Sequence, residues 1–231
     1  MFSLSGRDRL LKVLSVSLLA TFGAIALSGA AEGAVTPVHR TTASPTSILS
    51  AFERAWADVR AYTATITLFE KQDSRMQRAV YEYSFSKPSH ATLHVVSGTS
   101  AGDTLEWNGG STVVAHRGSG FLSVFKKTFS LHDKATTTIR GSSVDELSFG
   151  AIFAHAEHVR GALRLGPTGT VNGVATQSLT LIPTSASDAG YTREVVDLST
   201  STHLPVRVLG YHGKMLVRQV DFSQVHVTSQ R

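Results

Sequence analysis

The chain has 231 residues, a formal net charge of +5 and no cysteine. The lack of cysteine excludes a disulfide framework, a thiolate metal site and a lipid-modified N-terminal cysteine. Lys and Arg are scattered and form no basic stripe, so we expect no nucleic-acid partner. The mild positive charge is compatible with weak attraction to anionic lipid headgroups.

Residues 1–34 have the layout of a secretory signal peptide. A basic segment precedes an uncharged apolar run at residues 13–27, and small residues follow. This run is shorter than the roughly 20 residues that a membrane span needs. We therefore predict a signal peptide and processing region at 1–34, with cleavage after Ala30 or Ala31; an uncleaved N-terminal anchor is the alternative. The mature protein is expected to be periplasmic or secreted.

Residues 35–231 are predicted to form a single domain, because no linker rich in Pro, Gly or Ser divides them. A domain of about 200 residues buries roughly 70% of its unfolded surface, which suffices for a core without disulfides. It opens with an amphipathic helix at residues 46–60, capped by Ser44 or Thr46. The apolar residues of this helix share one stripe at helical period: Ile48, Leu49, Phe52, Trp56 and Val59.

Residues 62–117 alternate between apolar and polar side chains with the two-residue period of β-strands. Turn residues divide this stretch at Asp73-Ser74, Lys87-Pro88 and Asn108-Gly109-Gly110. Five antiparallel strands are predicted, forming a sheet with one apolar and one solvated face. The apolar positions of the first four strands are Tyr62, Ala64, Ile66 and Leu68; Ala79, Tyr81, Tyr83 and Phe85; Ala91, Leu93 and Val95; and Leu105 and Trp107.

The middle of the chain is less regular. Residues 118–127 are rich in apolar side chains, and residues 128–141 resemble a polar loop. A second helix is predicted from Ser143, with Ser142 or Ser143 as its cap and two acidic residues in its first turn, where they complement the helix dipole. Gly150 is expected to weaken this helix.

The last third returns to strands. They are predicted at residues 162–165, 170–171, 175–182, 191–198, 205–211 and 215–222, with turns at Asn172-Gly173 and His212-Gly213-Lys214. The order along the chain is therefore a helix, five strands, a helical insert, and four or five further strands.

Two patterns have partial features of chemical sites. Residues 98–102 match the G-x-S-x-G nucleophile elbow around Ser100, which requires a strand, a sharp turn and a helix. A strand-like alternation follows this serine, so a loop between antiparallel strands is the preferred interpretation. His155 and His158 are spaced to share a metal, but no third ligand follows at a recognised spacing. We therefore predict no catalytic residue, no metal site, no cofactor and no enzymatic activity.

An aromatic group needs a different explanation. Its members are Tyr81, Tyr83, Phe85, Trp107, Phe121 and Phe125. These side chains either form an ordinary core beneath the helices or, if the sheet is strongly curved, line a hydrophobic cavity. The sequence does not separate the two interpretations.

Three turn signatures resemble those of the Lol-type periplasmic lipoprotein carriers and their wider superfamily. In that family a strand ends in a basic residue and Pro, a hairpin carries Asp or Asn with Gly, and an aspartate is followed by a polar turn and Leu-Pro. Lys87-Pro88, Asn108-Gly109, and Asp197 with Leu204-Pro205 stand at these places. The resemblance covers roughly residues 44–226. It departs from the family at Lys87, where Arg is commoner, and in the insert at 121–160, which does not align.

The resemblance implies an α+β fold: a strongly curved antiparallel β-sheet, an open half-barrel, covered by the N-terminal helix and the middle helical insert. It also implies a monomeric periplasmic carrier that binds lipid or lipoprotein acyl chains for outer-membrane lipoprotein transport, with inner- and outer-membrane proteins as further partners. The alternative is an envelope-stress sensor or interaction module on the same fold, without transport. The predicted cavity residues are Phe52, Trp56, Ile66, Leu68, Tyr81, Tyr83, Phe85, Leu93 and Trp107.

Overall fold

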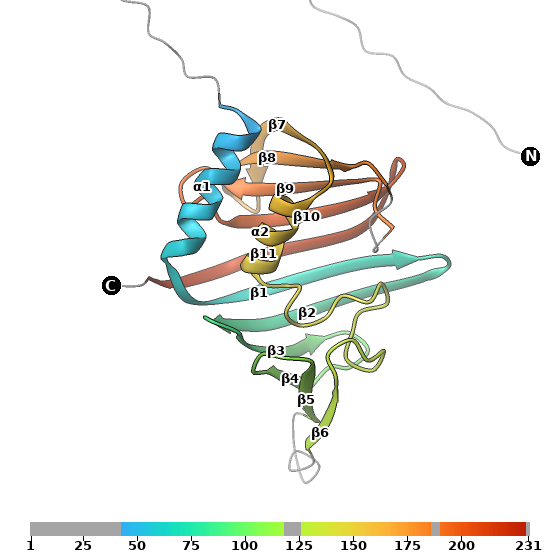
Figure 1. The fold of residues 1–231 in the computed structure, drawn as a ribbon. Coiled ribbons are helices and arrows are strands. Elements are labelled where there is room, and N and C mark those ends of the chain that lie inside the picture. Colours follow the sequence, from blue (N-terminus) through green and yellow to red (C-terminus); the bar gives the residue numbers. More distant parts are fainter. Residues whose placement is uncertain (1–42, 118–125, 186–189, 230–231) are drawn as a thin grey trace, which may run out of the picture. The chain divides into compact units, whose positions relative to one another are not determined.

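The computed structural model describes residues 43–117, 126–185 and 190–229, which fall within one compact unit of the chain (Figure 1). These ranges contain two helices, α1 (Pro45–Asp58) and α2 (Phe149–His158). The strands are β1 (Val59–Gln72), β2 (Arg75–Ser86), β3 (His90–Ser97), β4 (Asp103–Trp107), β5 (Thr112–Arg117), β6 (Lys126–Ser130), β7 (Gly161–Val171), β8 (Val174–Pro183), β9 (Arg193–Ser199), β10 (Pro205–His212) and β11 (Met215–Ser229). Within the described ranges, neither helix has the length and apolar character that crossing a membrane requires. The predicted signal peptide lies outside the described residues.

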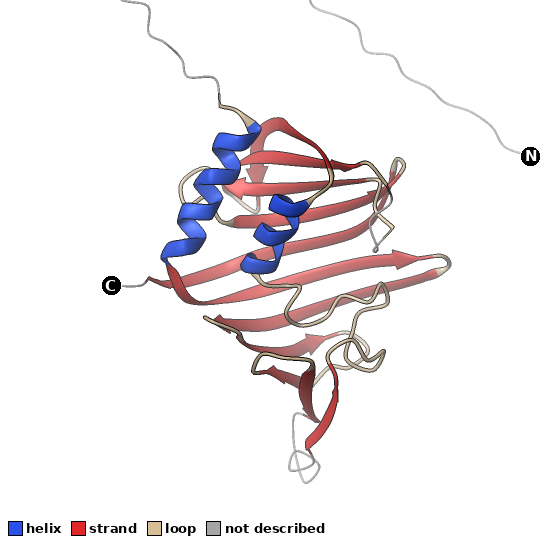
Figure 2. Cartoon of the chain, in the orientation of Figure 1, coloured by secondary structure: helices blue, strands red, loops and turns tan. Residues whose placement is uncertain are grey.

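The strands form one antiparallel sheet in the order β6-β5-β4-β3-β2-β1-β11-β10-β9-β8-β7. Two meanders, β1–β6 and β7–β11, meet where β1 pairs with β11, so that Ile66 lies opposite Phe222. The sheet is curved and open, with β6 and β7 as its edges. Both helices lie over the same face of the sheet (Figure 2). The predicted α+β half-barrel is therefore confirmed, and we call the helix-covered face the concave face.

The strand alternation determines what reaches the concave face. Ile66 on β1 lies opposite Tyr81 on β2, and Tyr83 in turn lies opposite Leu93 on β3. The predicted apolar positions of β1, β2 and β3 are all at most 7% exposed, and Leu105 and Trp107 of β4 are half-buried against the same cluster. The apolar face predicted from the two-residue period is therefore confirmed.

Helix α1 begins where the sequence indicates. The Ser44 side chain accepts a hydrogen bond from the Ser47 backbone N–H at 3.0 Å, and the Ser47 hydroxyl oxygen accepts one from the Ser44 backbone N–H at 2.9 Å. The helix ends two residues earlier than predicted, since Val59 takes an extended conformation and starts β1. Phe52 is fully buried and fixes the face that α1 presents to the sheet.

The predicted start of the second helix is wrong. Helix α2 begins at Phe149, and its cap is Ser148, whose side chain accepts from the Ala151 N–H at 3.1 Å. Ser143 instead belongs to a local turn, because its hydroxyl donates to Asp145 and its N–H donates to the Glu146 carboxylate at 3.2 Å. These local hydrogen bonds compete with helix formation.

Two strand predictions also need correction. Residues 128–130 are not loop but part of β6, which pairs with β5 so that Val113 lies opposite Phe129. The signal is weak because β6 is an edge strand with a single half-buried apolar residue. The two short strands predicted at 162–171 form one strand, β7, with a register shift between Leu165 and Thr168 around Gly166-Pro167.

Candidate functional site

The structure brings the nine predicted cavity residues together on and over the concave face. Seven are at most 6% exposed within one hydrophobic cluster: Phe52, Ile66, Leu68, Tyr81, Tyr83, Phe85 and Leu93. Trp56 and Trp107 are half-buried against this cluster. Phe121 and Phe125 lie outside the described residues. In this closed arrangement the face is covered by side chains of the protein itself, from α1, α2 and residues 131–148.

We refer to α1, α2 and residues 131–148 together as the lid. Its main contact with the sheet is aromatic. The Phe149 ring of α2 stacks on the Tyr62 ring of β1 with centroids 4.2 Å apart and an interplanar angle of 4°, and it meets Phe222 of β11 edge-on at 5.1 Å. Trp56 of α1 contacts the rings of Tyr62 and Phe85. The strength of such ring contacts depends more on the apolar area that they bury than on a fixed direction.

The two helices also contact each other. Phe52 of α1 and Phe153 of α2 pack edge to face at 5.4 Å. A Cβ at Gly150 would lie 2.8 Å from the Trp56 ring, so this glycine lets the two helices approach. The residue that the sequence marks only as a weak point in α2 is therefore a packing position, and the helices form a paired cover.

Two tyrosine hydroxyls of the sheet bind the lid backbone. The Tyr62 hydroxyl accepts a hydrogen bond from the Phe149 N–H at 3.1 Å, and the Tyr83 hydroxyl donates to the Val144 carbonyl at 3.1 Å. Burial raises the pKa of both phenols above their usual range, so both stay neutral and able to donate. The sequence marks both tyrosines as apolar-face residues but gives no signal for these bonds, which join segments 61 to 87 positions apart.

A buried ionic cluster lies at the other end of the concave face, near the β1–β2 turn. The Glu70 carboxylate is fully buried and accepts hydrogen bonds from the Arg140 backbone N–H at 3.1 Å and the Ser142 hydroxyl at 3.4 Å. Its charge partner is Arg218 of β11, whose Nε lies 3.5 Å away. Arg140 and Ser142 belong to the lid, whereas Glu70 and Arg218 belong to the sheet, so this cluster fastens the two together.

Helix α2 provides a second contact between titratable side chains of the lid and the sheet. The His155 Nε2 lies 2.7 Å from the carboxylate of Glu194 on β9, which is almost fully buried. The hydrogen bond to Glu194 raises the pKa of His155, and partial burial opposes this. His158, the other histidine of the predicted pair, does not join this contact, since its Nδ1 lies 2.8 Å from the Ala154 carbonyl. The pair therefore does not act as a unit in this structure.

Lys87, one of the residues that carry the family resemblance, caps helix α1. Its ammonium donates to the carbonyls of Trp56 at 2.6 Å and Ala57 at 3.1 Å, and it lies 4.4 Å from the centre of the Trp56 ring. A cation at a helix C-terminus satisfies carbonyls that lack helical partners and complements the dipole. The basic residue before Pro88 thus joins the end of β2 to the lid.

Ser100 lies in a turn between antiparallel strands β3 and β4, with hydrogen bonds that close the turn at Gly98–Ala101 and Ser100–Asp103. No helix follows it, so the strand–turn–helix arrangement of a nucleophile elbow is not formed at this position. Within the described residues, no group of three or more His, Cys, Asp or Glu side chains is arranged to hold a metal ion.

No family model and no curated protein matches this sequence. Solved structures with a similar fold include a putative outer membrane lipoprotein-sorting protein domain from Vibrio parahaemolyticus, at 16% identity and TM-score 0.42, covering 80% of this chain and 93% of that chain. Another is the lipoprotein LppX of Mycobacterium tuberculosis, at 13% identity and TM-score 0.43, covering 78% and 95%. A third is the MucA/MucB complex of Pseudomonas aeruginosa, at 14% identity and TM-score 0.39, covering 78% and 56%. These likenesses concern the fold alone.

Proposed function

We propose that the mature protein is an exported, non-enzymatic carrier that holds lipid or lipoprotein acyl chains between the concave face and the lid. The observation that carries the proposal is the aromatic seam under α1 and α2. There two short helices contact the sheet through the rings of Trp56 and Phe149, and the Tyr62 hydroxyl accepts one hydrogen bond from the lid backbone. An acyl chain can replace such a cover because it offers the sheet the same apolar contact.

The free energy of burying an acyl chain is large enough for a carrier to hold its cargo. An acyl chain gains about 0.8 kcal/mol for each buried CH₂ group. A chain of about sixteen carbons therefore gains on the order of 10 kcal/mol before the cost of opening the lid. Displacing the lid rings costs part of this, so the net affinity is lower and allows release at a target membrane. In this role the cargo is delivered to the outer membrane, and membrane proteins on either side of the periplasm serve as partners.

The test is native mass spectrometry of the protein purified from the periplasm, together with uptake of a fluorescent fatty acid by the purified protein. We expect a bound lipid and saturable uptake. Phe153→Glu places a charge at the helix–helix seam and should weaken uptake about tenfold or more. Val96→Glu is the matched control, since Val96 is 47% exposed and lies outside the hydrophobic cluster, and it should leave uptake unchanged. Absence of both bound lipid and uptake would contradict the proposal.

The second candidate function is an envelope sensor or interaction module without transport. It is favoured by one observation, namely that the lid side chains already occupy the concave face in the closed arrangement. A pull-down from membranes distinguishes the two candidates. Recovery of a membrane-anchored regulator without lipoproteins supports the sensor, whereas recovery of lipoproteins supports the carrier.

A further inference from the structure

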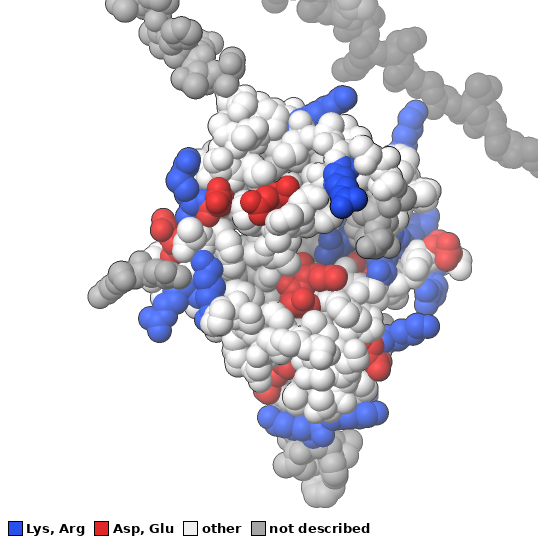
Figure 3. All heavy atoms as spheres, viewed as in Figure 1, with Lys and Arg blue, Asp and Glu red and all other residues white. Residues whose placement is uncertain are grey.

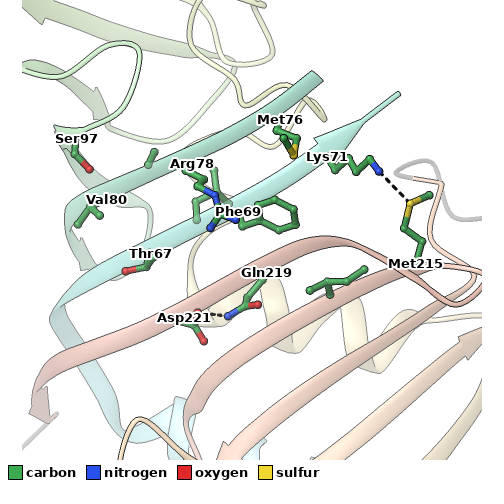
Figure 4. A pocket seen from close by; sticks show the side chains of 13 residues that line it. Thr67, Phe69, Lys71, Met76, Arg78, Val80, Ser97, Met215, Gln219 and Asp221 are labelled. Carbon is green, nitrogen blue, oxygen red and sulfur yellow. Dashed lines mark hydrogen bonds between the residues drawn. The ribbon is translucent and has the colours of Figure 1, made fainter. Parts of the chain in front are cut away.

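The face opposite the lid has an open hollow of about 600 Å³ between two hairpin turns (Figure 4). β1 and β11 pair as far as Glu70 and Arg218, and beyond this point the β1–β2 and β10–β11 hairpins continue as separate pairs. Phe69, which alternates with the buried Leu68 and Glu70, lines the hollow. The hollow therefore results from the register of the sheet.

Two of the three methionines of the chain, Met76 and Met215, lie at the rim of this hollow. Met76 is 69% exposed and Met215 is 45% exposed, although large apolar side chains normally avoid water. The Lys71 ammonium lies 3.4 Å from the Met215 sulfur and joins the two hairpins across the gap. Met76 and Met215 thus place two flexible apolar side chains at the rim of one hollow, and exposed methionines recur at adaptable binding surfaces.

Basic side chains outnumber acidic ones around the two methionines, and Asp221 also lines the hollow. Residues 71–78 carry Lys71, Arg75 and Arg78 against one acidic residue, and the turn at 212–215 carries Lys214 and no acidic residue. Arg75, Arg78 and Lys214 are exposed. In Figure 3 several Lys and Arg side chains, with acidic groups between them, lie along the right-hand edge of the molecule, where Figure 1 places the ends of these two hairpins. A positive rim around an apolar patch is complementary to an anionic, amphiphilic surface.

We propose that this hairpin-tip patch, consisting of Met76, Met215, Lys71, Arg75, Arg78 and Lys214, docks on an anionic phospholipid bilayer. The unbranched thioether side chains enter the interface without needing a shaped pocket, and the cations remain at headgroup level on long apolar stems. Anionic leaflets attract Lys and Arg close to their surface. Met76, Met215, Lys71 and Arg78 line the hollow on the face opposite the lid, so the inference does not depend on acyl chains occupying the concave face.

The test is co-sedimentation of the full mature protein with vesicles of phosphatidylcholine alone and with vesicles containing about one third phosphatidylglycerol. We expect binding to the anionic vesicles only, with an affinity that falls as salt is raised. The double substitution Arg75→Gln/Lys214→Gln should weaken binding about 25-fold, since each cation near an anionic surface contributes about fivefold. Met76→Ser/Met215→Ser should also weaken binding, with the net charge unchanged.

The matched control is Lys126→Gln/Lys127→Gln, which removes the same charge from the exposed edge strand β6. Urea denaturation checks that each variant stays folded. The inference is overturned if the control weakens binding as much as the hairpin-tip variant, if neutral vesicles bind equally well, or if neither vesicle binds. If the protein binds neither vesicle but captures a membrane protein, and the hairpin-tip variants lose this capture, the partner of the patch is a protein and not a bilayer.

Discussion

The two ends of the concave face hold the same lid by different means. At the α1 end ring contacts such as the stack of Phe149 on Tyr62 predominate, beside the hydrogen bonds of Tyr62 and Lys87 to helix backbone. At the β1–β2 turn end they are charges and hydrogen bonds, centred on the buried Glu70 and its partner Arg218. Ring contacts tolerate exchange for another apolar group, whereas removing one partner of a buried ionic contact leaves the other charge buried and unpaired. The difference suggests that the aromatic end accepts cargo and the ionic end defines the closed position of the lid.

The largest expected effect comes from breaking the ionic end. Glu70→Ala leaves Arg218, with a side chain only 12% exposed, without its carboxylate and also removes the acceptor for the Arg140 N–H. The free energy of unfolding should fall by about 4 kcal/mol, measured by urea denaturation. The double variant Glu70→Ala/Arg218→Met should recover much of this loss, because no charge is then left buried without a partner. If the double variant is as unstable as the single one, the charge pair is not the cause.

Breaking the aromatic end should have a slightly smaller effect. Phe149→Ala removes a fully buried ring that contacts both Tyr62 and Phe222, which costs about 3 kcal/mol. If the lid opens as a unit, hydrogen exchange at the α2 amides should speed up more than exchange in β1. Val96→Ala, outside the hydrophobic cluster, is the control and should change neither. Equal acceleration in helix and strand would show that the lid does not open separately from the sheet.

Removing one hydroxyl tests the bonds between the two ends. Tyr83→Phe keeps the ring but removes the donor to the Val144 carbonyl, in a buried setting. The expected loss of unfolding free energy is about 1–2 kcal/mol, measured by urea denaturation. A loss below about 0.3 kcal/mol would mean that water or another group satisfies this carbonyl, contrary to the bonding described for the closed lid.

The smallest effect should come from pH. The hydrogen bond to Glu194 raises the folded-state pKa of His155 above its ordinary value near 6.5, and Arg218 and Glu146 also face this histidine. The contact therefore stabilises the closed lid fully below the unfolded-state pKa and loses this contribution as pH rises through the folded-state pKa. Because the imidazole is 46% exposed, the effect should stay below about 1 kcal/mol. His155→Gln should remove this part of the pH dependence, and an unchanged pH profile would contradict it.

The sheet could be predicted from the sequence because its signal is local. The alternation from Tyr62 to Val95 and the turns at Asn172-Gly173 and His212-Gly213-Lys214 depend on neighbouring residues, and the structure bears them out. The start of α2 was predicted wrongly because Ser143 and Ser148 are both good caps, and only the local bonds of Ser143 decide between them. Edge strand β6 was missed because one of its faces has little to pack against.

The site was only partly predictable. The nine cavity residues follow from periodicity and lie together, but their use by cargo stays a prediction. The ionic end was not predicted from the sequence. Glu70 is a charged residue at the position where the next apolar side chain of β1 would stand, and its partner Arg218 is 148 positions away in sequence. Lys87 was noted as part of a turn and through the family resemblance, and its role as the cap of α1 required the geometry.

The most direct test of the central claim, that an acyl chain enters between α1 and the sheet, uses the two tryptophans of the chain. In a Trp107→Phe variant Trp56 is the only tryptophan that fluoresces, and its ring lies 5.6 Å from Phe85 and 6.4 Å from Tyr62 at the aromatic seam. Bromine atoms on a fatty acid quench tryptophan only at short range, so dibromostearate reports contact. The account predicts saturable quenching of Trp56 that excess unlabelled stearate reverses. Binding of the fatty acid without quenching, or no binding at all, would contradict it.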